Sequence, residues 1–336
     1  MKLAESLNLV PKYYAPSSWW QHVPIAHWLV ENLKPDKIVE LGSHYGISFF
    51  AFCEAASQFS DNTYTYAIDT WEGDEQAGYY DDDVFNKVAK EQQGYHRLRS
   101  TLIRDSFDNA LEYFPNDSID LIHIDGLHTY EAVKHDFLSW LPKVKEGGTL
   151  MFHDWNVRRT DFGVWKLWEE IKEDINFKCI ETPNGHGLGI ATKSSQEPEW
   201  HKELIATLPA LATKGFLLES IADNKEKIKN LLEESKVSQK HAQNLLEENK
   251  VSQKHAQNLL EENKVSQKHA QNLEQINREQ KMQIDKLEGM LYDQQMEIDK
   301  LKEMLYYQQK RLFNIRALKE CWLGKALLAT KNLIRR

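Results

Sequence analysis

The stretch at residues 39–48, VELGSHYGIS, constrains the fold of this chain more than any other segment. Its apolar residues predict a buried strand over residues 37–41. Gly42 and Gly46 then bracket a turn that leads into a helix at about Tyr45. Such a unit brings backbone N–H groups and a helix N-terminus close to a ligand, although in an ordinary strand–turn–helix the glycines serve geometry alone.

The acidic residue before the turn, Glu40, indicates which kind of ligand the turn binds. A pyrophosphate would be repelled by this carboxylate, and the third glycine of the dinucleotide fingerprint G-x-G-x-x-G is missing. A nicotinamide oxidoreductase is therefore disfavoured. S-adenosylmethionine carries an ammonium and a sulfonium group, so the pattern E-x-G-x-x-x-G favours a methyl-donor site.

Beyond the turn, predicted strands and helices alternate. The strands lie at residues 63–69, 98–104, 119–125 and 148–154, with two more near Lys178 and Gly189, and the helices lie at 49–58, 106–114, 130–141 and 164–173. This alternation predicts an α/β fold with a Rossmann-like, doubly wound, mostly parallel sheet of seven strands. We assign residues 37–200 to this domain and residues 1–36 to an aromatic, helical cap.

Charged or polar residues end four of the predicted strands: Glu40, Asp69, Asp125 and the pair His153-Asp154. Ligands of parallel sheets bind beyond the carboxyl ends of the strands, where these side chains converge. Core packing does not explain them, because strand interiors favour Val and Ile. The sequence therefore predicts a binding site at this edge of the sheet.

Further residues are candidates for contacts with the donor. Asp69 is placed to accept hydrogen bonds from the two ribose hydroxyls, as an acid after the second strand does in nucleotide sites. Asp105 and Ser106, after the third strand, lie within reach of an adenine edge. Trp71 either stacks on adenine or packs in the core.

Two other segments border the predicted site. The aromatic residues Trp19 and Trp20, with His22, either roof the pocket or pack beneath it, and a helix is expected from about His22 with Pro24 in its first turn. The acidic connection at residues 70–85 is too long for a plain strand–helix loop. It is either a lid over a polar acceptor or a solvated surface, and the sequence leaves both open.

The first ~195 residues carry the strings SWWQHVPIAHWLVENLKP, VELGSHYGISFFAFC, AIDTWEGDEQAG, IDLIHIDGLHTYEAVKHDF, GGTLMFHD, FGVWKLWEE and HGLG. In these strings the chain resembles class I S-adenosylmethionine-dependent methyltransferases. More narrowly, it is similar to a bacterial group that is often linked to glycosyltransferases and tailors polysaccharides and secondary metabolites. The resemblance implies donor binding by Glu40, Gly42, Ser43, Gly46 and Asp69, and O-methylation of a small molecule.

A hydroxyl is a poor nucleophile and needs a base or a metal. Asp125 and Asp154 end neighbouring strands and are expected to share Mg²⁺ or another divalent cation. The residue before Asp154 is His153, where some relatives have a second acid. His153 is then a third ligand or a packed histidine.

Several histidines lie near the predicted strand ends. His128, in DGLHTY, is the candidate general base, because its ordinary pKa suits neutral pH. The alternative is a helix-entry histidine bonded to backbone. His186 is a weaker candidate for the base, His123 is expected in the core, and His44 in the donor loop shapes that loop.

A repeated 14-residue unit begins at Asn230: NLLEESKVSQKHAQ and two copies of NLLEENKVSQKHAQ. MQIDKLEGMLYDQQ and MEIDKLKEMLYYQQ follow from Met282 and Met296. Fourteen residues are two heptads, so residues 228–312 predict a coiled coil about 130 Å long, after a connecting helix or linker at 201–227. Asn249, Asn263 and Asn277 at a positions favour self-association as a parallel dimer, with a trimer left open.

The charge and the cysteine content limit which binding partners and which cell compartment are expected. Residues 1–220 carry 20 basic and 34 acidic side chains, which argues against a nucleic-acid partner. No signal peptide is apparent, no window reaches the ~18 apolar residues of a membrane span, and Cys53, Cys179 and Cys321 form no metal or redox spacing. We therefore expect a cytoplasmic protein.

The C-terminal tail differs from the acidic body. Residues 311–336 carry seven basic side chains and one acidic side chain among Leu, Ile, Trp and Phe. A basic amphipathic tail at 313–336 is attracted to an anionic membrane surface. It would place the protein on the inner face of the membrane, unless it docks a partner enzyme or caps the coil.

Together these features predict an S-adenosylmethionine-dependent O-methyltransferase that acts on a sugar hydroxyl in a cell-surface glycan, such as O-antigen. The coiled coil would oligomerise the enzyme and position it, with a glycosyltransferase as the expected partner. The alternative is a coiled-coil scaffold that recruits glycosyltransferases and carries a vestigial methyltransferase domain. Neither the acceptor sugar nor the methylated hydroxyl follows from the sequence.

Overall fold

The computed structural model describes residues 5–96, 98–262 and 267–333. Side chains are described up to residue 307, apart from those of 95–96, 255–262 and 267–273. The chain divides into two compact units, residues 1–222 with 312–336 and residues 223–311.

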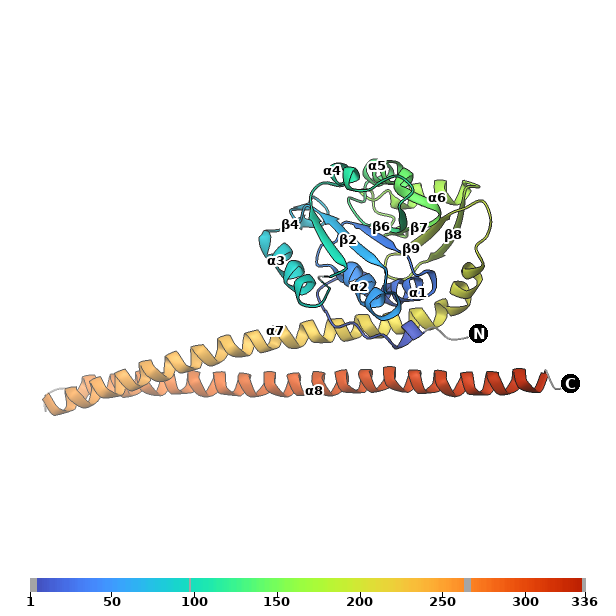
Figure 1. Ribbon diagram of the computed structural model, residues 1–336. Coiled ribbons are helices and arrows are strands. Elements are labelled where there is room, and N and C mark those ends of the chain that lie inside the picture. Colours follow the sequence, from blue (N-terminus) through green and yellow to red (C-terminus); the bar gives the residue numbers. More distant parts are fainter. Residues whose placement is uncertain (1–4, 97, 263–266, 334–336) are drawn as a thin grey trace. The chain divides into compact units, whose positions relative to one another are not determined.

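A seven-stranded sheet forms the centre of the first unit (Figure 1). Its order is β5 (Ser100–Arg104), β2 (Tyr64–Asp69), β1 (Lys37–Leu41), β6 (Ile119–Ile124), β7 (Val144–His153), β9 (Leu188–Lys193) and β8 (Phe177–Thr182). The first five strands are parallel, and β9 pairs antiparallel with both of its neighbours. The predicted mostly parallel sheet is confirmed, since the strands alternate with helices along the chain.

Helices cover both faces of the sheet (Figure 1). They are α1 (Val23–Leu33), α2 (Ile47–Phe59), α3 (Asp82–Glu91), α4 (Phe107–Ala110), α5 (Tyr130–Trp140) and α6 (Val164–Glu173). Successive strand residues point to opposite faces, so Ile38 packs with α1 and α2, whereas Val39 packs in the cluster of α5 and α6. Pro24 lies in the first turn of α1, as predicted.

The helix α7 (Glu199–Glu262) begins as part of this core. Its residues Leu204, Leu211 and Leu218 are fully buried in the cluster that contains α1. By length and composition, the helical stretch 199–254 is long and apolar enough to cross a membrane. This corrects the expectation that no segment of the chain is apolar enough for a membrane span. The core packing of these leucines explains the apolar run, and residues 201–222 are a core element rather than a linker.

The second unit is a helical hairpin. The later part of α7 pairs with the first part of α8 (Gln267–Leu333) through Lys227 with Glu297, Glu234 with Gln294, and Asn249 with Asn277. Partner numbers fall as α7 numbers rise, so the two helices run antiparallel.

The repeats therefore form a shorter rod than predicted. Leu245, Ile284, Ile298 and Leu301 of the predicted heptad seam are buried. The unbroken rod of about 130 Å is wrong, since the arms at residues 228–262 and 267–312 span only about 50 Å and about 70 Å at 1.5 Å per residue. The repeats in α7 and those in α8 have their apolar a and d positions in the same heptad register. The apolar face of one helix can therefore pack on that of the other within a single chain. Association of two or three chains, parallel or otherwise, stays a prediction.

Carbodiimide coupling tests the hairpin. The Lys227 ammonium and the Glu297 carboxylate lie 3.4 Å apart and are both exposed, so we expect an amide bond between them within one chain. In an unbroken helix these residues would be about 100 Å apart. Mass spectrometry of a mixture of ¹⁴N- and ¹⁵N-labelled chains should show the bond only between peptides of the same label. Lys227→Arg keeps the charge and should abolish the coupling, whereas mixed-label products would contradict the intrachain hairpin.

Glu54 of α2 gives a second prediction. Its Oε1 accepts a hydrogen bond from the Lys12 N–H, its Oε2 is buried without a partner, and burial raises the pKa of Glu54 to about 7. The folded state therefore holds the proton more strongly than the unfolded state, and stability should fall as pH rises from about 4.5 to 7. Glu54→Gln should remove up to about 3 kcal/mol of this loss. Urea unfolding at pH 5 and pH 8 measures it, and an equal pH response of both proteins would contradict the assignment.

Candidate active site

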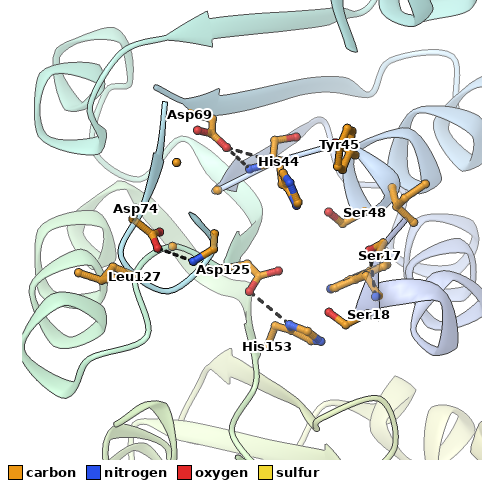
Figure 2. Close-up of a pocket in the computed structure, with 18 of the residues that line it drawn as sticks. Ser17, Ser18, His44, Tyr45, Ser48, Asp69, Asp74, Asp125, Leu127 and His153 are labelled. Atoms are coloured by element: carbon orange, nitrogen blue, oxygen red, sulfur yellow. Dashed lines mark hydrogen bonds and ion pairs between the residues drawn. The ribbon is translucent and has the colours of Figure 1, made fainter. Parts of the chain in front are cut away.

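A cavity of about 620 Å³ opens at the carboxyl edge of the parallel strands (Figure 2). It lies between the turn after β1, the ends of β2, β6 and β7, and the segment at residues 16–19 in front of α1. The predicted site residues that line it are Gly42, Ser43, Gly46, Asp69, Ser106, Asp125, His128, His153 and Asp154. The strand ends are therefore brought together as predicted.

The glycine turn lies directly against the end of β6. Gly42 has φ +84°, and a Cβ there would lie 2.1 Å from the carbonyl oxygen of Asp125, so only glycine fits. Gly46, with φ +80°, begins α2 at the cavity wall. The Ser43 Oγ is buried and has no hydrogen-bond partner, although Ser43 lines the cavity. An unpartnered hydroxyl and a helix N-terminus beside open space suit a polar ligand.

Asp69 fixes the shape of this turn. Its Oδ2 accepts hydrogen bonds from the N–H groups of Ser43, at 2.8 Å, and His44, at 2.9 Å, and its Oδ1 accepts one from the Trp71 N–H at 2.7 Å. Figure 2 shows the carboxylate beside His44 at the cavity wall. Asp69 therefore holds two loops together and still borders the cavity, where a ribose was expected.

Three predicted donor contacts lie outside the cavity lining. Trp71 is fully buried, and its Nε1 donates to the His44 carbonyl at 2.9 Å, so the prediction that it stacks on adenine is wrong. The Asp105 carboxylate is engaged in local hydrogen bonds, because its Oδ1 accepts from Ser106 N and Asn109 Nδ2. Glu40 is fully buried behind the turn, with its Oε1 unpartnered, so direct contact with a ligand in the cavity is not supported.

The carboxylate of Glu40 belongs to a buried chain of polar groups. The Trp19 indole N–H, which can only donate, lies 3.2 Å from His123 Nε2. The proton of the neutral His123 ring is therefore on Nδ1, which lies 3.0 Å from Glu40 Oε2. The chain joins the N-terminal cap to β6 and β1. Trp19 thus has both of the roles left open in the sequence, since it is buried and also borders the cavity.

Two carboxylates and two histidines meet at the ends of β6 and β7. His128 Nε2 lies 2.9 Å from Asp154 Oδ2 and 3.4 Å from Asp125 Oδ1. His153 Nδ1 lies 3.2 Å from Asp125 Oδ1 and 3.5 Å from Asp154 Oδ2. Asp154 has φ +62°, a strained conformation that is typical of functional sites. His186 reaches the other oxygen, Asp154 Oδ1, at 3.3 Å.

The protonation of this cluster follows from its contacts. Burial works against a charge on His128, but hydrogen bonds to Asp125 and Asp154 outweigh it and raise its pKa to about 9. Burial also opposes a charge on His153, yet the Asp125 carboxylate raises the pKa of His153 well above its ordinary value. Burial would raise the pKa of Asp125, but the His153 charge and the hydrogen bonds from both histidines hold it well below its ordinary range. Without a bound cation, His128 is therefore protonated at neutral pH and is not a free base.

The same groups fit a divalent cation. Among the described residues, Asp125, His128 and Asp154 offer three ligand atoms that all lie within 4.8 Å of one another. Carboxylate oxygens and an imidazole nitrogen suit Mg²⁺, Mn²⁺ or Zn²⁺. His128, expected as the base, is thus the third potential ligand. His153 faces the same oxygens but is only 2 % exposed, against 18 % for His128.

Sequence reasoning did not identify Gln76, Phe162 or the carbonyl of Gly185 as parts of the site. Gln76 bonds to His128, Phe162 stacks on the His128 ring at 4.7 Å, and the Gly185 carbonyl accepts from His22 and His153. The unusual length of the 70–85 connection was the one available signal for Gln76. For the other two, nothing local to the sequence marks the contact.

The segment that carries this site is similar to a known protein family. Residues 39–155, from β1 to just beyond Asp154, match the family model of a methyltransferase domain, so this part of the chain contains such a domain. The protein y4gI of Sinorhizobium fredii (strain NBRC 101917 / NGR234), described as uncharacterized, is 41% identical over 206 residues. The alignment covers 60% of this chain and 21% of y4gI, so this chain spans about a fifth of that relative.

Solved structures are also similar in part. A putative caffeoyl-CoA O-methyltransferase from Staphylococcus aureus has 17% identity and a TM-score of 0.42, over 56% of this chain and 88% of that one. The O-methyltransferase TomG from Streptomyces achromogenes, in complex with SAM, has 13% identity and a TM-score of 0.40, over 57% and 88%.

Proposed function

We propose that this chain is an S-adenosylmethionine-dependent O-methyltransferase. The observation that carries the proposal is the glycine turn after β1, packed against the end of β6 inside the segment that matches a methyltransferase domain. The turn, the unpartnered Ser43 hydroxyl and the Asp69 carboxylate lie on one wall of the cavity. The methionine part and the ribose of the donor would bind there, with Ser106 and Phe107 beside the adenine.

The acceptor hydroxyl would bind next to the carboxylate–histidine cluster. In the transfer, the bond between methyl carbon and sulfur breaks as the bond to the hydroxyl oxygen forms, S-adenosylhomocysteine leaves as a neutral thioether, and the hydroxyl proton passes to water in the cavity. The chain contributes mainly by holding donor and acceptor in line, which supplies a large share of the acceleration. A divalent cation held by Asp125, Asp154 and His128 would favour the deprotonated hydroxyl by its charge.

The acceptor class is the finer part of the proposal. The cavity lining includes Ser17, Ser18, Thr70 and Asp74, whose hydroxyl and carboxylate groups suit a polyhydroxylated ligand. This supports a sugar hydroxyl of a cell-surface glycan as the acceptor. The enzyme would then act in the cytoplasm or at the inner face of the membrane, beside a glycosyltransferase. The tail at 313–336 lies outside the residues whose side chains are described, so its membrane contact stays a prediction.

Donor binding separates an enzyme from a scaffold with a vestigial domain. Calorimetry should show S-adenosylmethionine binding to the full chain, and Gly42→Ala should weaken it at least about tenfold, because the added Cβ displaces the turn from Asp125. The matched control is Gly147→Ala, which has a similar φ of +79° but nothing within 4 Å of its Cβ. It should bind the donor like the wild type. No binding by the wild type would favour the scaffold.

The acceptor class has its own test. Mass spectrometry of the surface glycan should show an O-methyl group in cells with the wild-type chain and its loss in cells with Asp125→Ala. Asp61→Ala, at an exposed position outside the cavity lining, should leave the methyl group in place. A glycan that is identical in all three strains would refute a glycan acceptor, whatever the outcome of the donor test.

A further inference from the structure

Gln76 lies in the short hairpin formed by β3 (Gly73–Asp74) and β4 (Gly78–Tyr79), within the long connection after β2. Asp74 Oδ1 accepts hydrogen bonds from the N–H groups of Gln76, at 2.6 Å, and Ala77, at 2.7 Å. These bonds fix the turn, and Asp74 and Ala77 line the cavity. The hairpin is therefore an ordered wall of the site, and Gln76 is held where its side chain reaches inward.

The Gln76 amide joins three loops. Its Oε1 lies 2.9 Å from the His128 backbone N–H and 3.1 Å from His128 Nδ1, in the loop after β6. Its Nε2 donates to the carbonyl of Asp161 at 2.7 Å, in the loop after β7. One side chain from the connection after β2 thus ties together the loops that carry the carboxylate–histidine cluster.

Chemistry fixes the orientation of this amide. A backbone N–H only donates and a carbonyl only accepts, so the oxygen of Gln76 must face His128 and the nitrogen must face Asp161. His128 Nδ1 faces the same oxygen, so this nitrogen must carry a hydrogen. In the neutral ring, Nε2 then has the lone pair, and it points at Asp154 Oδ2, 2.9 Å away, and Asp125 Oδ1, 3.4 Å away.

Three electron-rich atoms that face one another need a cation between them, either a proton or a metal ion. Phe162 stacks on the ring with an interplanar angle of 7° and so holds its plane, and the His128 carbonyl accepts from the Gly163 N–H at 2.7 Å, which holds the loop. The contacts of Gln76 and Phe162 together leave His128 one direction for its lone pair.

We propose that Gln76 is a positioning residue that fixes the tautomer of His128 and so completes a divalent-cation site with Asp125 and Asp154. The proposal rests on the proposed methyltransferase function only for the use of that cation in catalysis. It also links the hairpin to the cluster, since the amide that orients His128 is the one that anchors the hairpin to Asp161. A chain without this amide would have a looser hairpin and a His128 ring whose tautomer is no longer fixed by a hydrogen bond at Nδ1.

Binding of Mn²⁺ to the full chain, measured by electron paramagnetic resonance, tests the proposal. Gln76→Met keeps the length of the side chain but removes the acceptor and the donor, and it should weaken Mn²⁺ binding by about 10- to 100-fold, as loss of a partner behind a metal ligand does. Gln76→Glu keeps an acceptor for His128, but it loses the donor to Asp161 and places a carboxylate oxygen beside that carbonyl. It should restore most of the Mn²⁺ affinity, a rescue that a merely structural role of Gln76 would not give.

The control is Glu75→Gln, an exposed neighbour in the same hairpin, which should bind Mn²⁺ like the wild type. Calorimetry with S-adenosylmethionine on the same samples separates the two proposals. If the wild type binds no donor, the proposed function fails while the Mn²⁺ comparison still decides the role of Gln76. Equal Mn²⁺ affinity of wild type and Gln76→Met, or no Mn²⁺ binding by the wild type, overturns the role of Gln76 even if the donor binds.

Discussion

Asp125 and Asp154 follow neighbouring parallel strands, so the sheet itself forces two carboxylates into one half-buried space. Like charges at this range repel strongly where water is scarce, and each carboxylate needs a positive or hydrogen-donating partner. His128 and His153 supply these partners, and the surrounding loops are arranged to hold the two rings. The geometry of the site follows from this requirement more than from any single loop.

A second requirement is that each of the two imidazole rings directs one particular nitrogen at the carboxylates. The Gly185 carbonyl accepts from His153 Nε2 at 3.0 Å and from His22 Nε2 at 2.9 Å, so it fixes the protonated nitrogens of both. Burial and the neighbouring His153 lower the pKa of His22 to about 3, and His22 stays neutral. The Gln76 side-chain oxygen fixes the protonated nitrogen of His128, as the Gly185 carbonyl fixes that of His153. His128 and His153 thus each have one nitrogen bound to an amide oxygen and the other directed at the carboxylates.

The N-terminal cap makes buried polar contacts with β6 and with the first part of α7. Trp19 reaches His123 and, through it, Glu40, while the buried Lys214 of α7 donates to the carbonyls of Ser6 and Leu9. Segments that are more than 200 residues apart in the sequence are therefore joined within the first unit. The helical repeats form a separate unit.

The sequence by itself determined the parallel sheet, the glycine turn and the polar strand ends. These depend on local rules, since hydrophobic periodicity sets strands and helices, and parallel strands gather their carboxyl ends at one edge. The heptad pattern of the repeats is read from the sequence by the same rule. Asp125 and Asp154 were placed at this edge by their positions after two strands, and His128 was placed there as the expected base.

Only the tertiary structure decided which of these groups border the cavity. Glu40 lies within β1 and Trp71 comes two residues after β2, but both are buried, because the elements packed on the sheet cover them. The contact of Gln76 with His128 spans 52 residues, and the chain reversal in the repeats depends on packing between segments with equivalent heptads. Contacts between distant segments leave no local pattern in the sequence, because their free energy comes from groups that only the fold brings together.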